Sequence, residues 1–488
     1  MSAIRHVLVL MLENRSFDHL LAYSGIPGLT GVDTSKTNPG STGPVAMSST
    51  TPDRLASDPG HEFEDVDWQI YGTEAGAVPR PVSMNGFADR GWPEAMQCAA
   101  PALVPVFTQL ARKFLVCDNW FSSMPGPTWP NRFFVHAASS GGLANSPSNL
   151  TTIGSMLWSK LGFSFSNGTI YDRLTQAGRS WRIYHGDHFP QVCAIDTMPS
   201  EFVADPVKFR RQNQLAADLS HGDVADYTFI EPDYSILSTF RNGNSQHPSG
   251  TLSAGEQLIH DVTSALMGSE VWQSSLLIIV YDEHGGLYDQ APPRACAAPG
   301  DDQTVNAGKA QNPPQPPFNF DRYGVRVPAV LVSPWVTPGS VSHETYDHAS
   351  VIRTVFELFG IPGQLTNRDA GATSLVPLLK AAMAAAVTLA APNPQPDPVP
   401  APSGENIHAH TIDAFARIAA QIHHALLNYA PGMQPAALHR AVQASPDVSN
   451  LPDLPKTASQ DESRAYIAKV AALVQAHRLR QMALRGQP

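Results

Sequence analysis

The chain has 488 residues and a formal net charge of −11; 15% of its residues are charged and 42% are hydrophobic. This length is sufficient for a large core, and the low charged fraction excludes a solvated, disordered chain. An acidic chain has no basic field to hold a nucleic-acid backbone, so we expect no nucleic-acid partner. The 43 prolines predict long ordered loops between short regular elements.

Three short apolar runs, bounded by polar or turn residues, predict fully buried parallel strands over residues 6–11, 275–281 and 327–333. Apolar positions at helical spacing fall between or after these strands, at 105–114, 169–178, 255–269 and 350–359. Loops are predicted around Gly126 and over 139–168 and 291–319. The alternation predicts an α/β fold in which helices cover both faces of a mostly parallel sheet.

The composition changes at about residue 381, where the chain becomes rich in alanine and then in proline. We therefore expect a main domain over 1–380, a linker over 381–406 and a helical extension over 407–488. The extension should contain amphipathic helices at 411–427, 433–444 and 462–484. Docking of these helices on the main domain is favoured over an independent partner-binding module.

Cysteine usage and hydropathy bear on the compartment. Cys98, Cys117, Cys193 and Cys296 include no C-x-x-C pair, which excludes a dense disulfide framework and leaves one or two disulfides open. No run of about 18 apolar residues is present, so no membrane span is predicted. The apolar segment 4–12 is too short for a secretory leader. We expect a soluble protein, cytoplasmic as the sequence stands, or secreted or periplasmic if a leader has been removed.

Oxygen-rich side chains follow two of the predicted strands. Glu13 and Asn14 come after the first strand, and Asp282 and Glu283 follow the second. Ligands of α/β sheets bind beyond the carboxyl ends of the strands, where these hard oxygen donors can converge on one divalent cation. The sequence therefore predicts a metal site at this edge of the sheet.

A proline-rich segment, residues 124–132, lies between the two clusters and contains Thr128. A metal-bound Thr128 alkoxide would be a nucleophile, and Asn131 and Arg132 could hold anionic oxygens. Two simpler interpretations remain open. A threonine among prolines is commonly a turn residue, and the acidic side chains can instead pair with Arg15 and Arg132.

Several of the 18 histidines stand in polar, turn-rich surroundings. They are His61, His185, His247 and His348. Each of them alone is more often structural than functional. Together they offer donors for a phosphoryl group and an acid for a leaving oxygen.

The motif Glu13-Asn-Arg-Ser-Phe-Asp-His19 resembles that of the bacterial phosphoesterase family, which unites non-haemolytic-type phospholipases C with AcpA-like acid phosphatases. Further motifs follow in the family's order, at 126–132, 229–234, 246–248, 281–288, 321–328 and 346–350. The resemblance implies an alkaline phosphatase-like three-layer α/β sandwich and phosphoester hydrolysis through a covalent phospho-enzyme.

Carried over by position, the resemblance makes Thr128 the nucleophile. It implies metal or phosphate ligands at Glu13, Asn14, Asp282 and Glu283, and places His61, His185 and His247 around the transferred group, with His284 and His348 as further candidates. A second metal site would need an acidic residue one helical turn before His247, where Gly243 stands. We therefore expect one divalent metal ion.

We expect a phospholipase C, with an acid phosphatase acting on phosphomonoesters as the alternative. An alternative of another class is a non-catalytic binding protein on the same scaffold. A phospholipase needs an apolar rim for peripheral contact with a bilayer, for which Trp129, Phe318 and Phe320 are the candidates. The acidic net charge disfavours anionic membranes and leaves zwitterionic lipids little affected.

Overall fold

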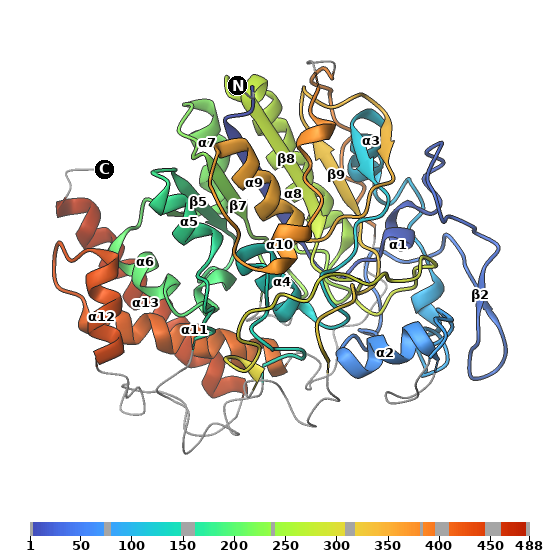
Figure 1. The fold of residues 1–488 in the computed structure, drawn as a ribbon, viewed down its shortest axis with the longest axis horizontal. Helices are drawn as coiled ribbons and strands as arrows, with labels where there is room; N and C mark the ends of the chain where they lie inside the picture. The colour runs from blue at the N-terminus through green and yellow to red at the C-terminus, as the bar shows by residue number, and fades with distance from the viewer. Residues whose placement is uncertain are drawn as a thin grey trace.

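The computed structural model describes residues 3–72, 80–147, 162–235, 240–307, 318–380, 384–395, 409–444 and 460–484. These residues form a central sheet of eight strands with helices on both of its faces (Figure 1). Parts of the loops predicted over 139–168 and 291–319, and most of the predicted linker, lie outside the described residues.

The strand order is β10 (Ser340–Ser342), β4 (Leu115–Cys117), β9 (Ala329–Val332), β8 (Ser275–Tyr281), β1 (His6–Leu12), β7 (Tyr227–Ile230), β5 (Trp181–His185) and β6 (Phe209–Arg211). All neighbouring pairs are parallel except the two that involve β9. The first two predicted strands are confirmed as β1 and β8. The prediction of a parallel strand over 327–333 is wrong in direction, because burial on both faces produces the same apolar run in either orientation.

The helices form two outer layers. On one face, α3 (Pro105–Lys113), α7 (Leu215–Ser220) and α8 (Leu252–Met267) pack together, and on the other lie α4 (Thr128–Ala137), α5 (Ile170–Gln176), α9 (Ala349–Phe359) and α10 (Asn367–Gly371). Helices α1 (Phe17–Leu21) and α2 (Phe63–Tyr71) follow the first strand, and α6 (Met198–Ala204) follows β5. The four helices predicted within this part of the chain are confirmed as α3, α5, α8 and α9.

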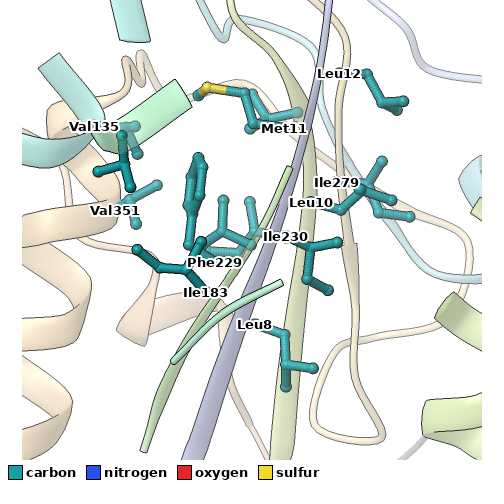
Figure 2. Packing of buried hydrophobic residues seen from close by; sticks show 14 of the residues in the cluster. Leu8, Leu10, Met11, Leu12, Val135, Ile183, Phe229, Ile230, Ile279 and Val351 are labelled. Atoms are coloured by element: carbon teal, nitrogen blue, oxygen red, sulfur yellow. The ribbon is translucent and has the colours of Figure 1, made fainter. Parts of the chain in front are cut away.

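The core lies on both sides of β1, as Figure 2 shows. Leu8 and Leu10 point to one side of this strand, and Met11 points to the other, because successive side chains of a strand alternate. On the Met11 side, Val135 of α4 and Val351 of α9 face the sheet. All of these side chains are fully buried, so α4 is anchored directly on the central strands.

The three predicted C-terminal helices are confirmed as α11 (Ala409–Asn428), α12 (Pro435–Ala444) and α13 (Gln460–Leu484). They lie beside the β5 end of the sheet, where α11 and α12 contact α6 (Figure 1). Phe415, Ile418 and Ile422 of α11 are fully buried. Residues 384–395 contain neither helix nor strand, and the expected boundaries at 381 and 406 stay predictions.

All four cysteines are free, so neither of the disulfides left open by the sequence is formed. Among the helices that the structure describes, none combines the length and the apolar character needed to cross a bilayer.

Candidate active site

The ends of β1 and β8 bring the two acidic motifs together. These parallel strands are in register, with Leu12 opposite Tyr281, so the residues that follow them are neighbours. The backbone N–H of Asn14 donates to Asp282 Oδ1 at 3.1 Å. Asn14 has a φ of 58°, a left-handed conformation that is uncommon for a residue other than glycine. Two sequence motifs separated by more than 260 residues thus form one site.

The side chain of Asn14 lies between the predicted nucleophile and a histidine. Its Oδ1 accepts a hydrogen bond from Thr128 Oγ1 at 3.2 Å, and its Nδ2 lies 3.3 Å from His61 Nε2. Thr128 is the first residue of α4 and is half-buried. Because backbone N–H groups at a helix N-terminus carry partial positive charge, this position suits a hydroxyl that receives an anionic group.

Asn131 fixes the loop before Thr128. Its Oδ1 accepts from the Met124 N–H at 3.0 Å, and its Nδ2 donates to the carbonyls of Gly126 and Pro127 at 2.9 and 3.1 Å. Both N–H groups of the Asn131 amide thus face its own loop, and the expectation that Asn131 holds anionic oxygens stays a prediction. In this structure Asn131 fixes the loop that precedes Thr128.

Arg132 lies among the carboxylates. Its Nε donates to Asp282 Oδ2 at 3.0 Å, and its Nη2 lies 3.9 Å from Glu13 Oε1. Its Nη2 also donates to the carbonyls of Met11 and Leu12 at 3.3 and 3.2 Å. The simpler interpretation of an acidic pair with Arg132 is therefore confirmed. Arg15 instead donates from Nε to the Gln246 carbonyl at 2.7 Å.

Burial strongly perturbs the three carboxyl groups. It raises the pKa of Glu13 well above its usual range, and Arg132 only partly opposes this effect. Burial likewise raises the pKa of Asp282 to about 6 against the opposing charge of Arg132. The pKa of Glu283 is also raised by burial, with His61 opposing. Burial therefore outweighs the stabilisation that Arg132 and His61 give to the ionised forms of these three carboxyl groups.

Two of these carboxyl oxygens, Glu13 Oε2 and Glu283 Oε1, are buried without a hydrogen-bond partner in the described part of the chain. Unpartnered hard oxygens of this kind are suited in chemistry to a divalent cation. Within the described residues, however, no three His, Cys, Asp or Glu side chains are arranged so that they could hold a metal ion as they stand.

A cavity of about 170 Å³ opens above Thr128. Four acidic residues line it, namely Glu13, Asp58, Glu62 and Asp65. Its other lining side chains include Thr128, His61, His247, Gln191, Trp129 and Phe240. Among the described residues that line it there is no lysine or arginine, so this part of the cavity is acidic with aromatic walls.

His61 and His247 are the two predicted histidines that reach the cavity. Burial lowers the pKa of His61, but the charges of Glu283 and Asp58 outweigh this effect and raise the pKa to about 10. His61 is therefore cationic at neutral pH. The His247 ring stacks on Phe240 with centroids 4.4 Å apart, and its Nε2 lies 3.8 Å from Asp58 Oδ2.

His185 does not line this cavity. Its Nδ1 lies 2.8 Å from the Asp187 carbonyl, and its ring contacts Phe202 of α6. Burial and the nearby Arg478 and Arg211 lower its pKa well below the usual value, so it is neutral. The expectation that His185 surrounds the transferred group finds no support in this geometry, because its strand directs it toward α6.

His284 and His348 lie in the layer behind the acidic residues. His284 Nε2 is 2.7 Å from Gln69 Oε1, and burial lowers its pKa to about 3. His348 Nε2 is 2.6 Å from the Asp282 carbonyl, and Trp120 Nε1 donates to its Nδ1 at 3.3 Å. Because both ring nitrogens of His348 have protein partners, it supports Asp282 and leaves no nitrogen for a cation.

The predicted apolar rim is wrong for two of its three residues. Trp129 and Phe320 are only 2% and 4% exposed. The Trp129 ring packs against Phe133 and against Phe415 of α11, with centroids 6.3 and 6.2 Å apart. Only Phe318 is half-buried. The C-terminal helices cover the surface on which Trp129 was expected.

Several cavity residues escaped the sequence analysis. Asp58 and Glu62 flank His61 in one short acidic motif, which was a usable signal. No sequence pattern pointed to Gln191. It lies at the start of a 3-10 turn, η4 (Gln191–Ala194), and the position of this turn depends on a carboxylate that is distant in the sequence. The Gln191 N–H donates to Glu231 Oε2 at 2.5 Å.

The chain belongs to the phosphoesterase family, and the match covers residues 4–362. It is 34% identical over 404 residues to non-specific phospholipase C3 of Arabidopsis thaliana, spanning 77% of this chain and 73% of that protein. It is 25% identical over 420 residues to phospholipase C B of Mycobacterium tuberculosis, spanning 74% of each chain. The family thus includes plant as well as bacterial proteins.

One solved structure that resembles the chain is a protein of the alkaline phosphatase superfamily from Vibrio parahaemolyticus. It is 12% identical, has a TM-score of 0.30, and covers 72% of this chain and 76% of that one. The three-layer α/β fold rests on the sheet and helices described above. Family membership and the phospholipase C relatives establish a phosphoric ester hydrolase, and the alternative of a non-catalytic binding protein has no support.

Proposed function

We propose that this protein is a phospholipase C-type hydrolase that acts through a phospho-Thr128 intermediate with the assistance of one divalent cation. The observation that carries the proposal is the hydrogen bond from Thr128 to Asn14 at the head of α4, inside a cavity that also contains His61 and Glu13. A nucleophile, an acid and a set of buried oxygens are the groups that transfer of a phosphoryl group to a hydroxyl requires.

Glu13, Asn14, Asp282 and Glu283 are the residues that would hold the cation. When bound, it supplies positive charge that lowers the pKa of a neighbouring hydroxyl and stabilises phosphoryl oxygens. The unpartnered oxygens of Glu13 and Glu283 support this assignment.

The side chains of the cavity account for the rest of the reaction. Asn14 orients Thr128 Oγ1, which loses its proton to solvent water and attacks phosphorus while the bond to the leaving alcohol breaks; solvent returns that proton when the Thr128 oxygen leaves in the second half of the reaction. Cationic His61 gives its proton to that alcohol. In the second half of the reaction, water attacks the phosphorus of the phospho-threonine. His61, now neutral, accepts a proton from this water, and the Thr128 oxygen leaves.

The lining of the cavity favours a diester over a monoester. Carboxylates such as Asp58 and Glu62 repel the dianionic phosphate of a monoester more than the single charge of a diester. The same carboxylates, together with the rings of Trp129 and Phe240, suit a substrate with a cationic head group. A zwitterionic phospholipid is therefore the substrate class that we propose.

The test compares hydrolysis of p-nitrophenylphosphorylcholine with that of p-nitrophenyl phosphate by the wild type, Thr128→Ala and Thr128→Ser. We expect diester cleavage to dominate and Thr128→Ala to lose activity by about 10,000-fold. Acid quenching during turnover of the diester should trap one phosphorylcholine group on the wild type, located at Thr128 by peptide mass spectrometry. Full activity of Thr128→Ala would overturn the mechanism, and dominant monoester cleavage would make the protein a phosphatase.

The cation is tested separately with a chelator. Dialysis against EDTA should lower kcat, and addition of a divalent metal should restore it. Glu283→Gln should weaken metal binding measured by calorimetry. A chelated enzyme with unchanged activity and no bound metal by elemental analysis would refute the assignment.

A further inference from the structure

Gln191 is a cavity residue that the mechanism above does not use. It lines the cavity with Thr128 and is 4% exposed. It begins the turn η4, which is held on the end of β7 because Glu231 accepts hydrogen bonds from the N–H groups of Gln191 and Val192 at 2.5 and 3.0 Å. Glu231 is itself buried, so the backbone of Gln191 has a fixed place.

The side-chain amide of Gln191 has one end fixed and the other end open. Tyr234 donates from its hydroxyl to Gln191 Oε1 at 3.1 Å. Gln191 Nε2 makes no hydrogen bond within the described residues, and it is not among the buried polar atoms that lack a partner. Its N–H groups are therefore accessible from the cavity.

Tyr234 is held on three sides. Its ring lies beneath the Arg132 guanidinium, whose Cζ is 5.2 Å from the ring centroid. The ring centroids of Tyr234 and Phe415 are 6.1 Å apart. Its backbone N–H donates to Asp187 Oδ2 at 2.5 Å. A tyrosine fixed in this way determines which end of the Gln191 amide faces the cavity.

We propose that Gln191 Nε2 donates a hydrogen bond to a non-bridging oxygen of the substrate's phosphoryl group, and that Tyr234 is the positioning residue for this donor. The inference rests on the proposed function. In a cavity lined by four acidic residues, a phosphoryl group gains from donors that offset repulsion, and an amide N–H with no acceptor in the described part of the chain supplies one. A single such donor typically contributes about 10- to 100-fold in binding or rate.

The experiment measures two quantities for Gln191→Ala, Gln191→Glu and Tyr234→Phe. They are kcat/KM for p-nitrophenylphosphorylcholine and the inhibition constant of inorganic phosphate. We expect Gln191→Ala to lower kcat/KM and raise the inhibition constant, each by about 10- to 100-fold. Gln191→Glu should lower kcat/KM and raise the inhibition constant further than Gln191→Ala does, because it replaces the donor with another carboxylate. Tyr234→Phe should raise the inhibition constant less, with an unchanged melting temperature.

Matched controls are Gln257→Ala and Tyr429→Phe. Gln257 is an exposed residue of α8, and the Tyr429 hydroxyl accepts a hydrogen bond from the Gly432 N–H. An inhibition constant for phosphate that is unchanged in Gln191→Ala would overturn the inference. If only the KM for the substrate rose, the inference would also fail, because Gln191 would then contact the leaving alcohol and not the phosphoryl group.

A failure of the inference can be distinguished from a failure of the mechanism. Calorimetric titration of inorganic phosphate into Thr128→Ala, with and without Gln191→Ala, tests the donor when the nucleophile is absent. Weaker phosphate binding in the double variant supports the role of Gln191 even if Thr128 proves not to be the nucleophile. Equal binding contradicts it even if Thr128 is confirmed.

Discussion

At the scale of single residues, the site depends on a close approach of two backbones. Gly285 has a φ of 63°, and a Cβ added there would lie 2.3 Å from the Asn14 carbonyl oxygen. Asn14 must keep its own left-handed conformation for its amide to reach Thr128. The approach therefore couples the loop after β8 to Thr128, the proposed nucleophile.

We predict that Gly285→Ala lowers both stability and activity. The clash and the positive φ should cost about 1–3 kcal/mol of unfolding free energy, and displacement of Asn14 should lower kcat. Gly222→Ala is the control, because Gly222 has a φ of 69° with no atom within 4 Å of an added Cβ. Denaturant unfolding and kcat measure the two effects. Loss of stability with kcat unchanged would show that the position of Asn14 does not affect catalysis.

The sequence indicated the convergence of the acidic residues but not the direction of individual side chains. Glu13 and Asp282 could be predicted to meet, because both follow buried strands of one sheet. Whether an amide such as that of Asn131 faces the substrate or its own loop depends on three-dimensional hydrogen bonds. The same holds for His185, whose orientation toward α6 has no counterpart in the local sequence.

At the scale of secondary-structure elements, a buried carboxyl group joins two helices. Glu256 of α8 accepts hydrogen bonds from the N–H groups of Val106 and Phe107 at the start of α3, at 2.6 and 3.1 Å. Burial raises its pKa from the usual 4.5 to about 8, although these bonds oppose the shift. The folded state therefore binds this proton more tightly than the unfolded state does.

This shift predicts a pH dependence of stability. The contribution of Glu256 is fully present below about pH 4.5 and is lost as the pH rises through about 8, where the buried group must ionise. Glu256→Gln keeps one acceptor and removes the titration. We expect its melting temperature to fall less than that of the wild type between pH 5 and 9. Parallel profiles for the two proteins would contradict the prediction.

A second prediction at this scale concerns α11. Phe415 packs edge-on against Trp129, the residue after Thr128, and also contacts Tyr234. Phe415→Ala should cost about 3–5 kcal/mol of unfolding free energy and lower kcat by loosening the start of α4. Leu427→Ala on the same helix is the control, because Leu427 is 60% exposed. Equal effects of the two variants would show that α11 does not support the site.

Strand length explains what the sequence analysis missed in the fold. The two seven-residue strands, β1 and β8, are long enough to give a clear apolar run. Strands β4 and β6 have three residues each, too few for a pattern to stand out. Strand β9 was recognised, but an apolar run carries no information about direction, so its antiparallel pairing could not be predicted.

At the scale of the whole molecule, we expect charge to govern the proposed encounter with a lipid surface. The chain carries a net charge of −11, and the cavity itself is acidic. We predict that hydrolysis of phosphatidylcholine in vesicles slows as phosphatidylglycerol is added at low salt, because the anionic surface repels the enzyme. Added sodium chloride should relieve this inhibition by screening. Faster hydrolysis on anionic vesicles would indicate a basic docking surface instead.

The contact between Phe415 and Trp129 joins the region of the family match to sequence beyond it. The family match ends at residue 362, whereas α11 begins at Ala409, yet both contribute to one hydrophobic core. Trp129 also lines the cavity, so α11 supports one side of its wall from outside the matched region. We therefore expect a chimaera that keeps every motif but replaces α11 to have an altered cavity wall.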